Sequence, residues 1–521
     1  MKRRSSNQYK YFNTDHLRSD LKKRAVRGTG AVVFSNMSGY GIQMIGTIVL
    51  ARLLAPDDFG LVAMVTAFSL LLQNFGVNGF TEAVIQCEEI HHKQISTLFW
   101  IQLVLSLALT LLLMALAPII AGFYKEPRLE SITIAIAPSV IFAGLSTQHL
   151  ALLQRNMQFY STSALEVAAT TLSVTTAIAL AYWGWGYWTL VARRLFLPLV
   201  TAVGAWKLCR WRPGLPALGT GVGPMLKFAI NTYGNFTVSY FSRNLDKVLI
   251  GWRFGTQSLG FYDRAYHLFV MPANQLIHPV TRVAIAALSR LCNDPERYRR
   301  YYLNAISMIA FIGMPMSAML ILIADDLTLL LLGPQWNKAG QILAVFGAGL
   351  GTMLIYTTHG WLHLSLGRAD RWFRWGIIAF VVTTLSLIVG LAFGLLGVTI
   401  AYTVSFYVLI GPGLWYAGKP INLKLFHLLS AIWRYYLSAL SAGLLCWFIF
   451  YSLALTSEIF IGLNIFLRIL VSFILCLSMY LSLIVAVHQS IKPISQFISV
   501  LREMVPIIKY RLIKEARRSS G

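Results

Sequence analysis

The chain has 521 residues, of which 57% are hydrophobic and only 12% are charged, against roughly 25% charged residues in soluble proteins. A water-soluble globular fold is therefore excluded, and the apolar surplus predicts many membrane-spanning helices. Lys and Arg number 44 against 20 Asp and Glu, a formal net charge of +24. In a membrane protein this excess predicts basic cytoplasmic segments and no nucleic-acid partner.

Fourteen stretches are apolar over about 20 residues, which is enough to cross roughly 30 Å of hydrocarbon as a helix. In chain order they are 29–51, 61–85, 96–122, 131–152, 160–182, 187–206, 223–242, 259–281, 302–324, 339–363, 375–394, 396–417, 433–454 and 460–487. Nine of the first 27 residues are Lys or Arg, and no clear small-residue cleavage site follows them. The first stretch is therefore predicted to be a retained span and not a signal peptide.

The distribution of basic residues predicts the orientation of these spans. With the N-terminus placed inside, 30 Lys and Arg residues fall in cytoplasmic segments, seven fall outside and seven lie within spans. Basic residues concentrate on the cytoplasmic side of membrane proteins. We therefore predict an all-α, multi-pass membrane protein with about 14 transmembrane helices and with both termini in the cytoplasm.

Two segments share a layout. "ARLLAPDDFGLV" at 51–62 and "GWRFGTQSLGFY" at 251–262 each end one span, turn on the outside and open the next span near a glycine. An offset of 200 residues aligns Gly60 with Gly260, although only four of 41 aligned residues are identical. Because six spans separate the copies, both have the same orientation, which is the plan of transporters built from parallel repeats.

Four segments resemble a known family. They are "ARLLAPDDFGLVAM" (51–64), "LLQRNMQF" (152–159), "LDKVLIGWRFGTQSLGFYDRAYHL" (245–268) and "LLGPQW" (331–336). They look like the polysaccharide exporters of the Wzx or colanic-acid-exporter type, within the multidrug/oligosaccharidyl-lipid/polysaccharide exporter superfamily. The resemblance covers at least residues 30–420. It implies two pseudo-symmetric six-helix bundles that form a V around a central cavity, with two extra C-terminal helices.

The same resemblance implies the activity and the partners. The expected activity is a flippase that moves an undecaprenyl-pyrophosphate-linked oligosaccharide from the inner to the outer leaflet of the bacterial inner membrane by alternating access, for exopolysaccharide, capsule or O-antigen assembly. The expected partners are this lipid-linked oligosaccharide, the bilayer, and polymerase and chain-length components of a polysaccharide assembly system. No cofactor is expected, and a proton or sodium gradient or the membrane potential is the expected energy source.

The predicted domains follow from the spans and the resemblance. They are a basic cytoplasmic tail (1–28), an N-terminal six-helix bundle (29–206), a cytoplasmic linker (207–222), a C-terminal six-helix bundle (223–417), two accessory helices (433–487) and a second basic cytoplasmic tail (488–521).

Basic residues within the spans are the candidate contacts for the substrate. An anionic pyrophosphate and its sugars cannot cross bare hydrocarbon without a large desolvation penalty, so a polar, cationic path is needed. Arg193, Arg194 and Arg264 are the candidates for this cationic cavity. Arg193 and Arg194 follow the aromatic turn "YWGWGYW" by five residues, about 7 to 8 Å of helix rise. The alternative is a helix that starts later and leaves both outside.

A second set of charges lies near the predicted outer ends of the repeated spans. The candidates for a gate or for structural ion pairs are Arg52, Arg243, Asp246, Lys247, Arg253 and Asp263. Two interpretations stay open. Asp246 pairs locally with Arg243 or Lys247, or the ion pairs close the outer mouth in one state and separate in another.

Glu166 is the candidate for coupling to a proton or cation, because a lone carboxylate within a span must be neutral or paired. A hydrogen-bonded structural acid is the alternative. His359 and His363 are spaced i, i+4, but no third ligand lies nearby, so no metal site is predicted. The five cysteines also lack the spacing of a zinc site or a disulfide framework.

Other functions fit the sequence less well. A multidrug or small-solute exporter on the same fold would favour an acidic cavity, whereas the spans carry an excess of basic residues. A polysaccharide polymerase or acyltransferase would need a large outside loop or a buried His with acidic partners. No lysine is followed by Ser or Thr, so the chain has no GxxxxGK[ST] phosphate loop. A transporter, not an enzyme, is predicted.

Overall fold

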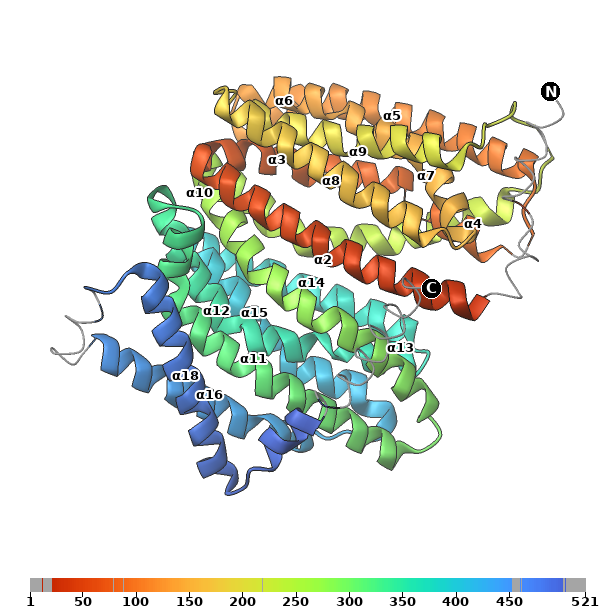
Figure 1. Cartoon of the computed structure of the whole chain (residues 1–521). Helices are drawn as coiled ribbons and strands as arrows, with labels where there is room; N and C mark the ends of the chain where they lie inside the picture. Colours follow the sequence, from red (N-terminus) through yellow and green to blue (C-terminus); the bar gives the residue numbers. More distant parts are fainter. Residues whose placement is uncertain are drawn as a thin grey trace, which may run out of the picture. The chain divides into compact units, whose positions relative to one another are not determined.

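The structure, a computed structural model, describes residues 12, 21–77, 79–87, 89–217, 219–451, 460, 462–499 and 502. All regular secondary structure in these residues is helical (Figure 1), so the predicted all-α fold is confirmed. The chain divides into two compact units: Met1–Asp263 with Leu332–Gln335, and Arg264–Leu331 with Trp336–Gly521. The predicted domain boundaries stay a prediction.

In the described part of the chain, the first unit contains eight helices and part of the next. These are α2 (Leu21–Leu53), α3 (Pro56–Val77), α4 (Phe80–Gln86), α5 (His92–Tyr124), α6 (Arg128–Ile136), α7 (Pro138–Arg155), α8 (Phe159–Tyr182), α9 (Trp188–Cys209) and the first part of α10 (Gly223–Arg290). Helix α2 packs against α8, α8 against α9, α9 against α7 and α7 against α5. The short helix α4 packs on α7, beside a buried aromatic cluster that includes Phe99 and Trp211.

The second unit contains the rest of α10 and the helices that follow. These are α11 (Pro295–Leu331), η2 (Pro334–Trp336, shared with the first unit), α12 (Asn337–Thr357), α13 (His359–Ser365), α14 (Ala369–Leu391), α15 (Gly394–Gly418), η3 (Lys419–Ile421), α16 (Leu425–Tyr451) and α18 (Ile465–His488). Helix α11 packs against α12, and α12 against α15, which pairs with α14. The two C-terminal helices α16 and α18 pair with each other and both dock on α11.

Polar contacts attach the C-terminal helices to α11. Arg468 of α18 forms an ion pair with Asp326 of α11. The Tyr480 hydroxyl of α18 donates a hydrogen bond to the Phe311 carbonyl oxygen at 2.9 Å. An intramembrane arginine normally has such a partner. Arg468, a basic residue within a predicted span, is therefore a structural contact of the accessory pair.

Each predicted span overlaps helical structure. Three spans consist of two consecutive helices, α3 with α4, α6 with α7, and α12 with α13, and the spans 223–242 and 259–281 both fall in α10. Several helices extend beyond the predicted limits. Helix α11, for example, covers Pro295–Leu331, whereas hydropathy predicts 302–324. The reason is physical: hydropathy marks the edge of the hydrocarbon, and a helix continues into water while its backbone hydrogen bonds continue.

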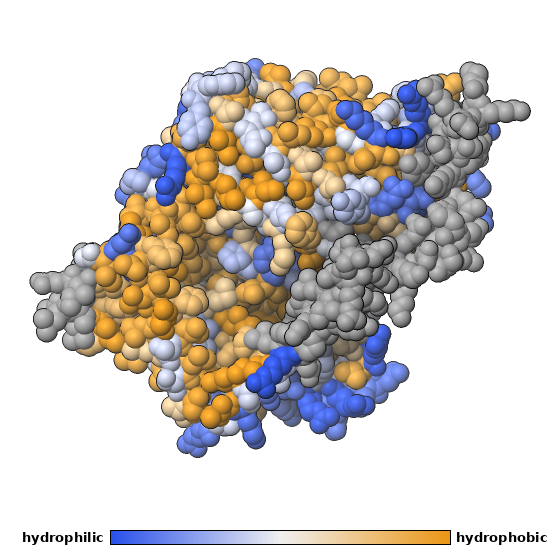
Figure 2. Space-filling view, in the orientation of Figure 1, coloured by the Kyte–Doolittle hydropathy of each residue, from blue (hydrophilic) through white to orange (hydrophobic). Residues whose placement is uncertain are grey.

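The outer surface of the helices fits a bilayer. In the described part of the chain, ten helical segments are long and apolar enough to cross a membrane. Their lipid-compatible faces carry exposed Leu, Ile, Val and Phe side chains, as on α5, α14 and α18. Figure 2 shows broad hydrophobic surfaces, with hydrophilic residues gathered mainly near helix ends. The chain is a multi-pass membrane protein.

Helix α10 consists of two arms. Gly255 has φ 78° and ψ −174°, a left-handed conformation that favours glycine and breaks the helix. The Lys247 Nζ and Asp263 Oδ1 atoms lie 2.8 Å apart, although 16 residues of straight helix would separate them by about 24 Å. The two arms therefore fold back on each other at Gly255, which gives the two separate spans that the sequence predicts.

Candidate functional site

A close helix crossing joins α3 to the second arm of α10. A Cβ atom on Gly60 would lie 1.8 Å from the Thr256 carbonyl oxygen, and one on Gly260 would lie 1.9 Å from the Pro56 carbonyl oxygen. The 200-residue offset relates Pro56 to Thr256 and Gly60 to Gly260, so the two contacts are copies of each other. Each glycine of one copy contacts the equivalent carbonyl group of the other copy, as expected for a contact with two-fold symmetry. Only glycine permits the approach at either position.

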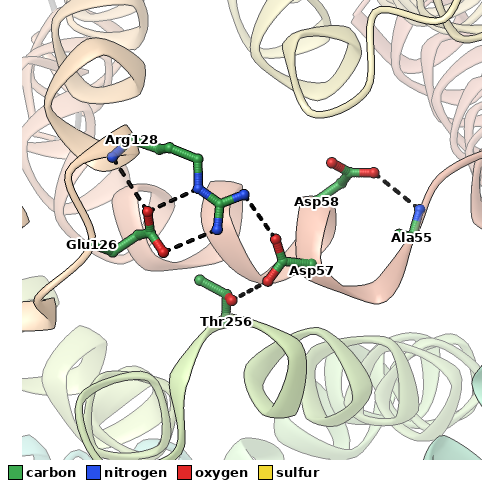
Figure 3. A network of polar contacts seen from close by, with 6 residues as sticks. All are labelled: Ala55, Asp57, Asp58, Glu126, Arg128 and Thr256. Atoms are coloured by element: carbon green, nitrogen blue, oxygen red, sulfur yellow. Dashed lines mark hydrogen bonds and ion pairs between the residues drawn. The ribbon is translucent and has the colours of Figure 1, made fainter.

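A polar network surrounds this crossing, at the end of the unit that the charge distribution predicts to face outward (Figure 3). Arg128, at the start of α6, pairs with Asp57 of α3 at 3.0 Å and with Glu126 at 2.8 Å. The other Asp57 oxygen accepts a hydrogen bond from the Thr256 hydroxyl. The hydrogen bond from Arg128 holds the pKa of Glu126 below its ordinary value. The network thus ties three turns together: α2–α3, α5–α6 and the Gly255 turn.

Two side chains satisfy the backbone where α2 ends and α3 begins. Asp58 accepts a hydrogen bond from the Ala55 N–H at 3.0 Å, as a helix-capping acid does. Gln335 donates to the Ala51 and Leu54 carbonyl oxygens at 2.6 and 3.0 Å. Ala51 lies in the last turn of α2 and Leu54 follows the helix directly, where the helix backbone supplies no further N–H donors to its carbonyl oxygens. The segments 331–336 and 51–64, both used for the family resemblance, therefore meet.

The first arm of α10 runs alongside α3 for much of its length. The Tyr240 hydroxyl donates to the Ala67 carbonyl oxygen at 2.7 Å. Further along, a Cβ atom on Gly79 would lie 2.6 Å from the Ala229 Cα atom. Together with the crossing at Gly60, these contacts place the two helices antiparallel. The first arm of α10 therefore packs on protein along one of its sides.

A buried charge cluster lies between the two arms of α10. Asp246 and Asp263 are 2% and 4% exposed. Lys247 bridges to Asp263 at 2.8 Å, the Tyr262 hydroxyl donates to Asp246 at 2.7 Å, and the Lys247 N–H donates to the same carboxylate at 2.8 Å. Since Gly255 lies eight residues from both Lys247 and Asp263, the ion pair sits about 12 Å below the turn. Helix α10 is not among the ten apolar candidate spans of the described chain.

The other residues of the predicted gate lie on α2 and α10. Arg52, in the last turn of α2, is exposed, and Arg253 is exposed with its guanidinium 5.9 Å from the Phe254 ring centroid. Arg243 lies in α10, but its side chain is outside the described residues. The Lys247 side chain pairs with Asp263, and the Lys247 backbone N–H donates to Asp246. The local ion pair of Asp246 with Arg243 or Lys247 stays a prediction. The gating role stays a prediction.

The candidate cavity residues lie on two helices. Helix α9 begins at Trp188, so Arg193 and Arg194 are in its second turn, as the sequence predicts. Arg193 is half-buried, its carbonyl oxygen accepts a hydrogen bond from Ser173 of α8 at 3.3 Å, and Arg194 is exposed. Arg264 follows the Asp263 ion pair directly and is half-buried. Substrate binding by these residues stays a prediction.

Glu166 lies in the first unit and the two histidines lie in the second. Glu166 is exposed on α8. His359 is hydrogen-bonded to the Tyr356 carbonyl oxygen at 2.6 Å, and His363 is buried beside Tyr416. Within the described residues, no group of three His, Cys, Asp or Glu side chains could hold a metal ion.

Several residues of the network were not predicted. Asp57, Arg128, Glu126, Thr256 and Gln335 carry most of its contacts. The repeat gives one usable signal, because the offset of 200 residues aligns the Thr256 turn with the Pro56 turn. The pairing of Arg128 with Asp57 has no local signal, since 71 residues separate them.

The fold is that of a multi-pass membrane protein with buried charges between two of its helical arms. The chain matches the family described as "Polysaccharide biosynthesis protein" over residues 49–341, and it belongs to this family. It is 25% identical over 428 residues to the teichuronic acid biosynthesis protein TuaB of Bacillus subtilis (strain 168), covering 82% of this chain and 89% of that protein. It is 23% identical to the lipopolysaccharide biosynthesis protein WzxC of Escherichia coli (strain K12), covering 78% of this chain and 85% of that protein.

Solved structures share the fold. The lipid II flippase MurJ, in an inward closed conformation, superposes with a TM-score of 0.71 at 15% identity, over 89% of this chain and 99% of that chain. An inward-facing multidrug resistance MATE family transporter of the MOP superfamily superposes with a TM-score of 0.59 at 14% identity, over 73% of this chain and 94% of that chain. The predicted resemblance to Wzx-type polysaccharide exporters and the transporter class are confirmed.

Proposed function

We propose that this protein is a flippase for an undecaprenyl-pyrophosphate-linked oligosaccharide, which it moves from the inner to the outer leaflet of the bacterial inner membrane by alternating access. The product would enter exopolysaccharide, capsule or O-antigen assembly. Membership of the polysaccharide biosynthesis protein family supports this function. So do the names of the relatives, which place them in teichuronic acid and lipopolysaccharide biosynthesis.

The observation that carries the proposal is the buried charge cluster of α10. Asp246, Lys247 and Asp263 form a polar core about 12 Å below the Gly255 turn. Buried ionisable groups within a membrane protein usually mark a path for ions or polar substrates. A lipid-linked sugar needs such a path for its anionic head, while its apolar tail can remain in lipid. The cluster also lies in the helix that holds one copy of the repeat, where transporters place their substrate path.

We assign the cationic part of the path to Arg193, Arg194 and Arg264. A guanidinium group binds two phosphate oxygens at once, which suits a pyrophosphate. Arg52, Arg243, Asp246, Lys247, Arg253 and Asp263 are assigned to the gate. In this proposal the Lys247–Asp263 pair holds the two arms of α10 together while the path is closed on that side.

Transport is proposed to draw on Glu166 or on the membrane potential. An anionic head that moves outward is favoured by about 2.3 kcal/mol per charge per 100 mV of inside-negative potential, so an ion gradient is not required. Glu166→Gln separates the two sources. Loss of ion-dependent flux at a normal protein level would support Glu166, and unchanged flux would leave the potential as the source.

Gene deletion tests the function in the cell. In the deletion strain, lipid-linked oligosaccharide should accumulate on the cytoplasmic leaflet, and a plasmid-borne copy should reverse this. Accumulation on the outer leaflet would contradict the proposal and indicate a defect in polymerisation. Tags at both termini that are protected from external protease in intact spheroplasts would support the proposed cytoplasmic termini.

A further inference from the structure

Three cations lie together at one end of the α14–α15 helix pair. The Arg371 guanidinium of α14 lies 4.4 Å from the Tyr416 ring centroid and donates to the Tyr416 carbonyl oxygen at 2.5 Å. Lys419, directly after α15, has its ammonium group 4.0 Å from the Trp415 ring centroid. Arg374 is exposed one helical turn after Arg371. Among the described residues, no carboxylate forms an ion pair with these three cations, so their charge is open to an anionic ligand.

This end of the helix pair has the composition of a membrane–water interface. Trp372, Phe373 and Trp415 are exposed beside the cations. Exposed Trp side chains gather at the level of the lipid headgroups, and basic residues at this level are attracted to anionic headgroups. The anion that fits the three cations is therefore the phosphate of a lipid.

An apolar stripe begins at the cations and follows α14. It starts within one turn of Arg374, and its exposed side chains lie at helical spacing: Ile377, Ile378, Val381, Leu385 and Val389. Helix α14 has the smallest buried share, 17%, among the ten candidate spans of the described chain. A hydrocarbon chain can therefore lie along this helix.

The stripe ends in a groove between α14 and α15. The groove has a volume of about 610 Å³, and its walls include Val389 of α14 with Ile400 and Val404 of α15. Ser386 is its single polar side chain, and the Ser386 hydroxyl donates to the Val382 carbonyl oxygen at 2.9 Å. No polar side chain of the groove is left for a polar ligand, so its occupant is hydrocarbon.

The distance between the cations and the groove selects a long chain. Leu385 and Val389, two residues of the groove wall, lie eleven and fifteen residues after Arg374, about 16 and 22 Å along a helix. One leaflet contributes about 15 Å, half of a hydrocarbon core of roughly 30 Å. The chain of an ordinary phospholipid with its head at Arg374 ends where the groove begins, whereas a chain longer than one leaflet enters it.

We propose that the α14–α15 pair binds a polyprenyl phosphate lipid. Its phosphate lies at Arg371, Arg374 and Lys419, and its chain follows the apolar stripe into the groove. The inference rests on the proposed function, which supplies such a lipid, and adds a docking site on the exposed face of α14 in the second unit. The charge distribution predicts that the cations face the cytoplasm, so the site would receive the lipid from the inner leaflet.

Native mass spectrometry of the full-length protein tests the site with two lipids that have the same head. Undecaprenyl phosphate and farnesyl phosphate both carry one phosphate, but only undecaprenyl phosphate has a chain that reaches the groove. We expect the wild type to bind undecaprenyl phosphate at least about tenfold more tightly, because burial of a few methylene groups changes affinity by this factor. Val404→Trp, which fills the groove, should remove this preference. Ile474→Trp, at an exposed position of α18, should retain it.

A second pair of variants tests the cations. Arg374→Gln/Lys419→Gln should weaken the binding of both phosphates by at least about tenfold, since each basic residue near the headgroups contributes roughly a fivefold factor. Both side chains are exposed, and Arg371 keeps its contact with Tyr416. Arg290→Gln/Arg300→Gln removes the same charge at exposed positions of the second unit and is the control.

Two results would overturn the site: equal affinity of the wild type for the two phosphates, or a preference that Val404→Trp leaves unchanged. Displacement of undecaprenyl phosphate by an equal concentration of phosphatidylglycerol would also overturn it, because the site would then take an ordinary anionic phospholipid. The assay requires no transport. A wild type that shows the expected preference but translocates no oligosaccharide would contradict the proposed function and leave the site standing, whereas translocation without the preference would overturn the site alone.

Discussion

Gly60 and Gly260 lie at equivalent positions of a 200-residue repeat, and each faces the backbone carbonyl group four residues before the other. The sequence relationship, four identities in 41 residues, is weak, yet the spatial relationship is reciprocal. The repeat therefore has a structural role: its two copies pack on each other and form a helix crossing that neither copy could form alone.

Alanine at either glycine should destabilise this crossing. A Cβ atom on Gly60 would overlap the Thr256 carbonyl oxygen, which cannot move without its helix. Overpacking of this kind typically costs about 1–3 kcal/mol. We expect Gly60→Ala and Gly260→Ala each to lower the Tm in detergent. The decrease in the double variant should be smaller than the sum of the two single decreases, because both substitutions open the same contact. Gly122→Ala, in α5 with open space around it, is the control. An unchanged Tm for Gly60→Ala would contradict the crossing.

The Lys247–Asp263 pair should behave as a buried ion pair. Removing one partner leaves an uncompensated buried charge, which typically costs about 3–5 kcal/mol. We expect Lys247→Asp and Asp263→Lys to reduce the amount of folded protein severely, and the exchange of both to restore part of it. The same exchange at the exposed Arg297–Asp294 pair should change Tm little. If the double exchange at 247 and 263 is no better folded than the single variants, the pair does not carry stability.

Glu126 gives the polar network around the Gly60–Gly260 crossing a pH dependence. Its pKa is lowered in the folded chain by the hydrogen bond from Arg128, from an ordinary value of 4.5. A group with a depressed folded pKa stabilises the fold above its unfolded pKa, and this stability is lost as the pH falls through the folded pKa. We expect the wild type to exceed Glu126→Gln in Tm at neutral pH and the difference to shrink below pH 4.5. Thermal scans of both proteins from neutral pH to below pH 4.5 test this expectation. A difference in Tm that stays constant over these pH values would exclude Glu126 as the source of the pH dependence.

Gln335 should stabilise the end of α2. Its amide is the side-chain donor to the Ala51 and Leu54 carbonyl oxygens. A buried acceptor left without a donor typically costs about 1–3 kcal/mol. We expect Gln335→Leu to lower the Tm, whereas Gln257→Leu, at an exposed position of the Gly255 turn, should have little effect. Equal Tm values for the two variants would show that solvent replaces the amide.

Arg193 allows the substrate path to be tested apart from the fold. If its guanidinium binds the pyrophosphate, Arg193→Gln should reduce flux with little change in Tm, and Arg193→Lys should restore flux only in part because an ammonium group lacks the planar fork. Arg212→Gln, at an exposed position of the loop after α9, serves as the control. Normal flux in Arg193→Gln would remove this residue from the path.

The features that could be predicted from the sequence are those that depend on composition and on local residue patterns. Hydropathy located the spans, and the repeat predicted that Gly60 and Gly260 are equivalent, because both signals lie along the chain. The sequence also placed Asp246, Lys247 and Asp263 in one region, since a short turn joins the arms that carry them.

The partners of these side chains could not be predicted in the same way. Lys247 pairs with Asp263 across the Gly255 turn, because the two arms of α10 bring this carboxylate, 16 residues away along the chain, to the ammonium group. Arg128 and Gln335 reach partners 71 and 284 residues away. Such contacts depend on tertiary packing, and no local spacing encodes them.

Translocation by the purified protein tests the proposed function most directly. Liposomes that contain the protein and an undecaprenyl-pyrophosphate-linked oligosaccharide are treated with a glycosidase that cannot cross the membrane. We expect the wild type to expose the inner-leaflet pool, so that nearly all of the oligosaccharide is cleaved, while protein-free liposomes keep that pool protected. Protection equal to that in protein-free liposomes, for several oligosaccharides and with an imposed membrane potential, would contradict the account.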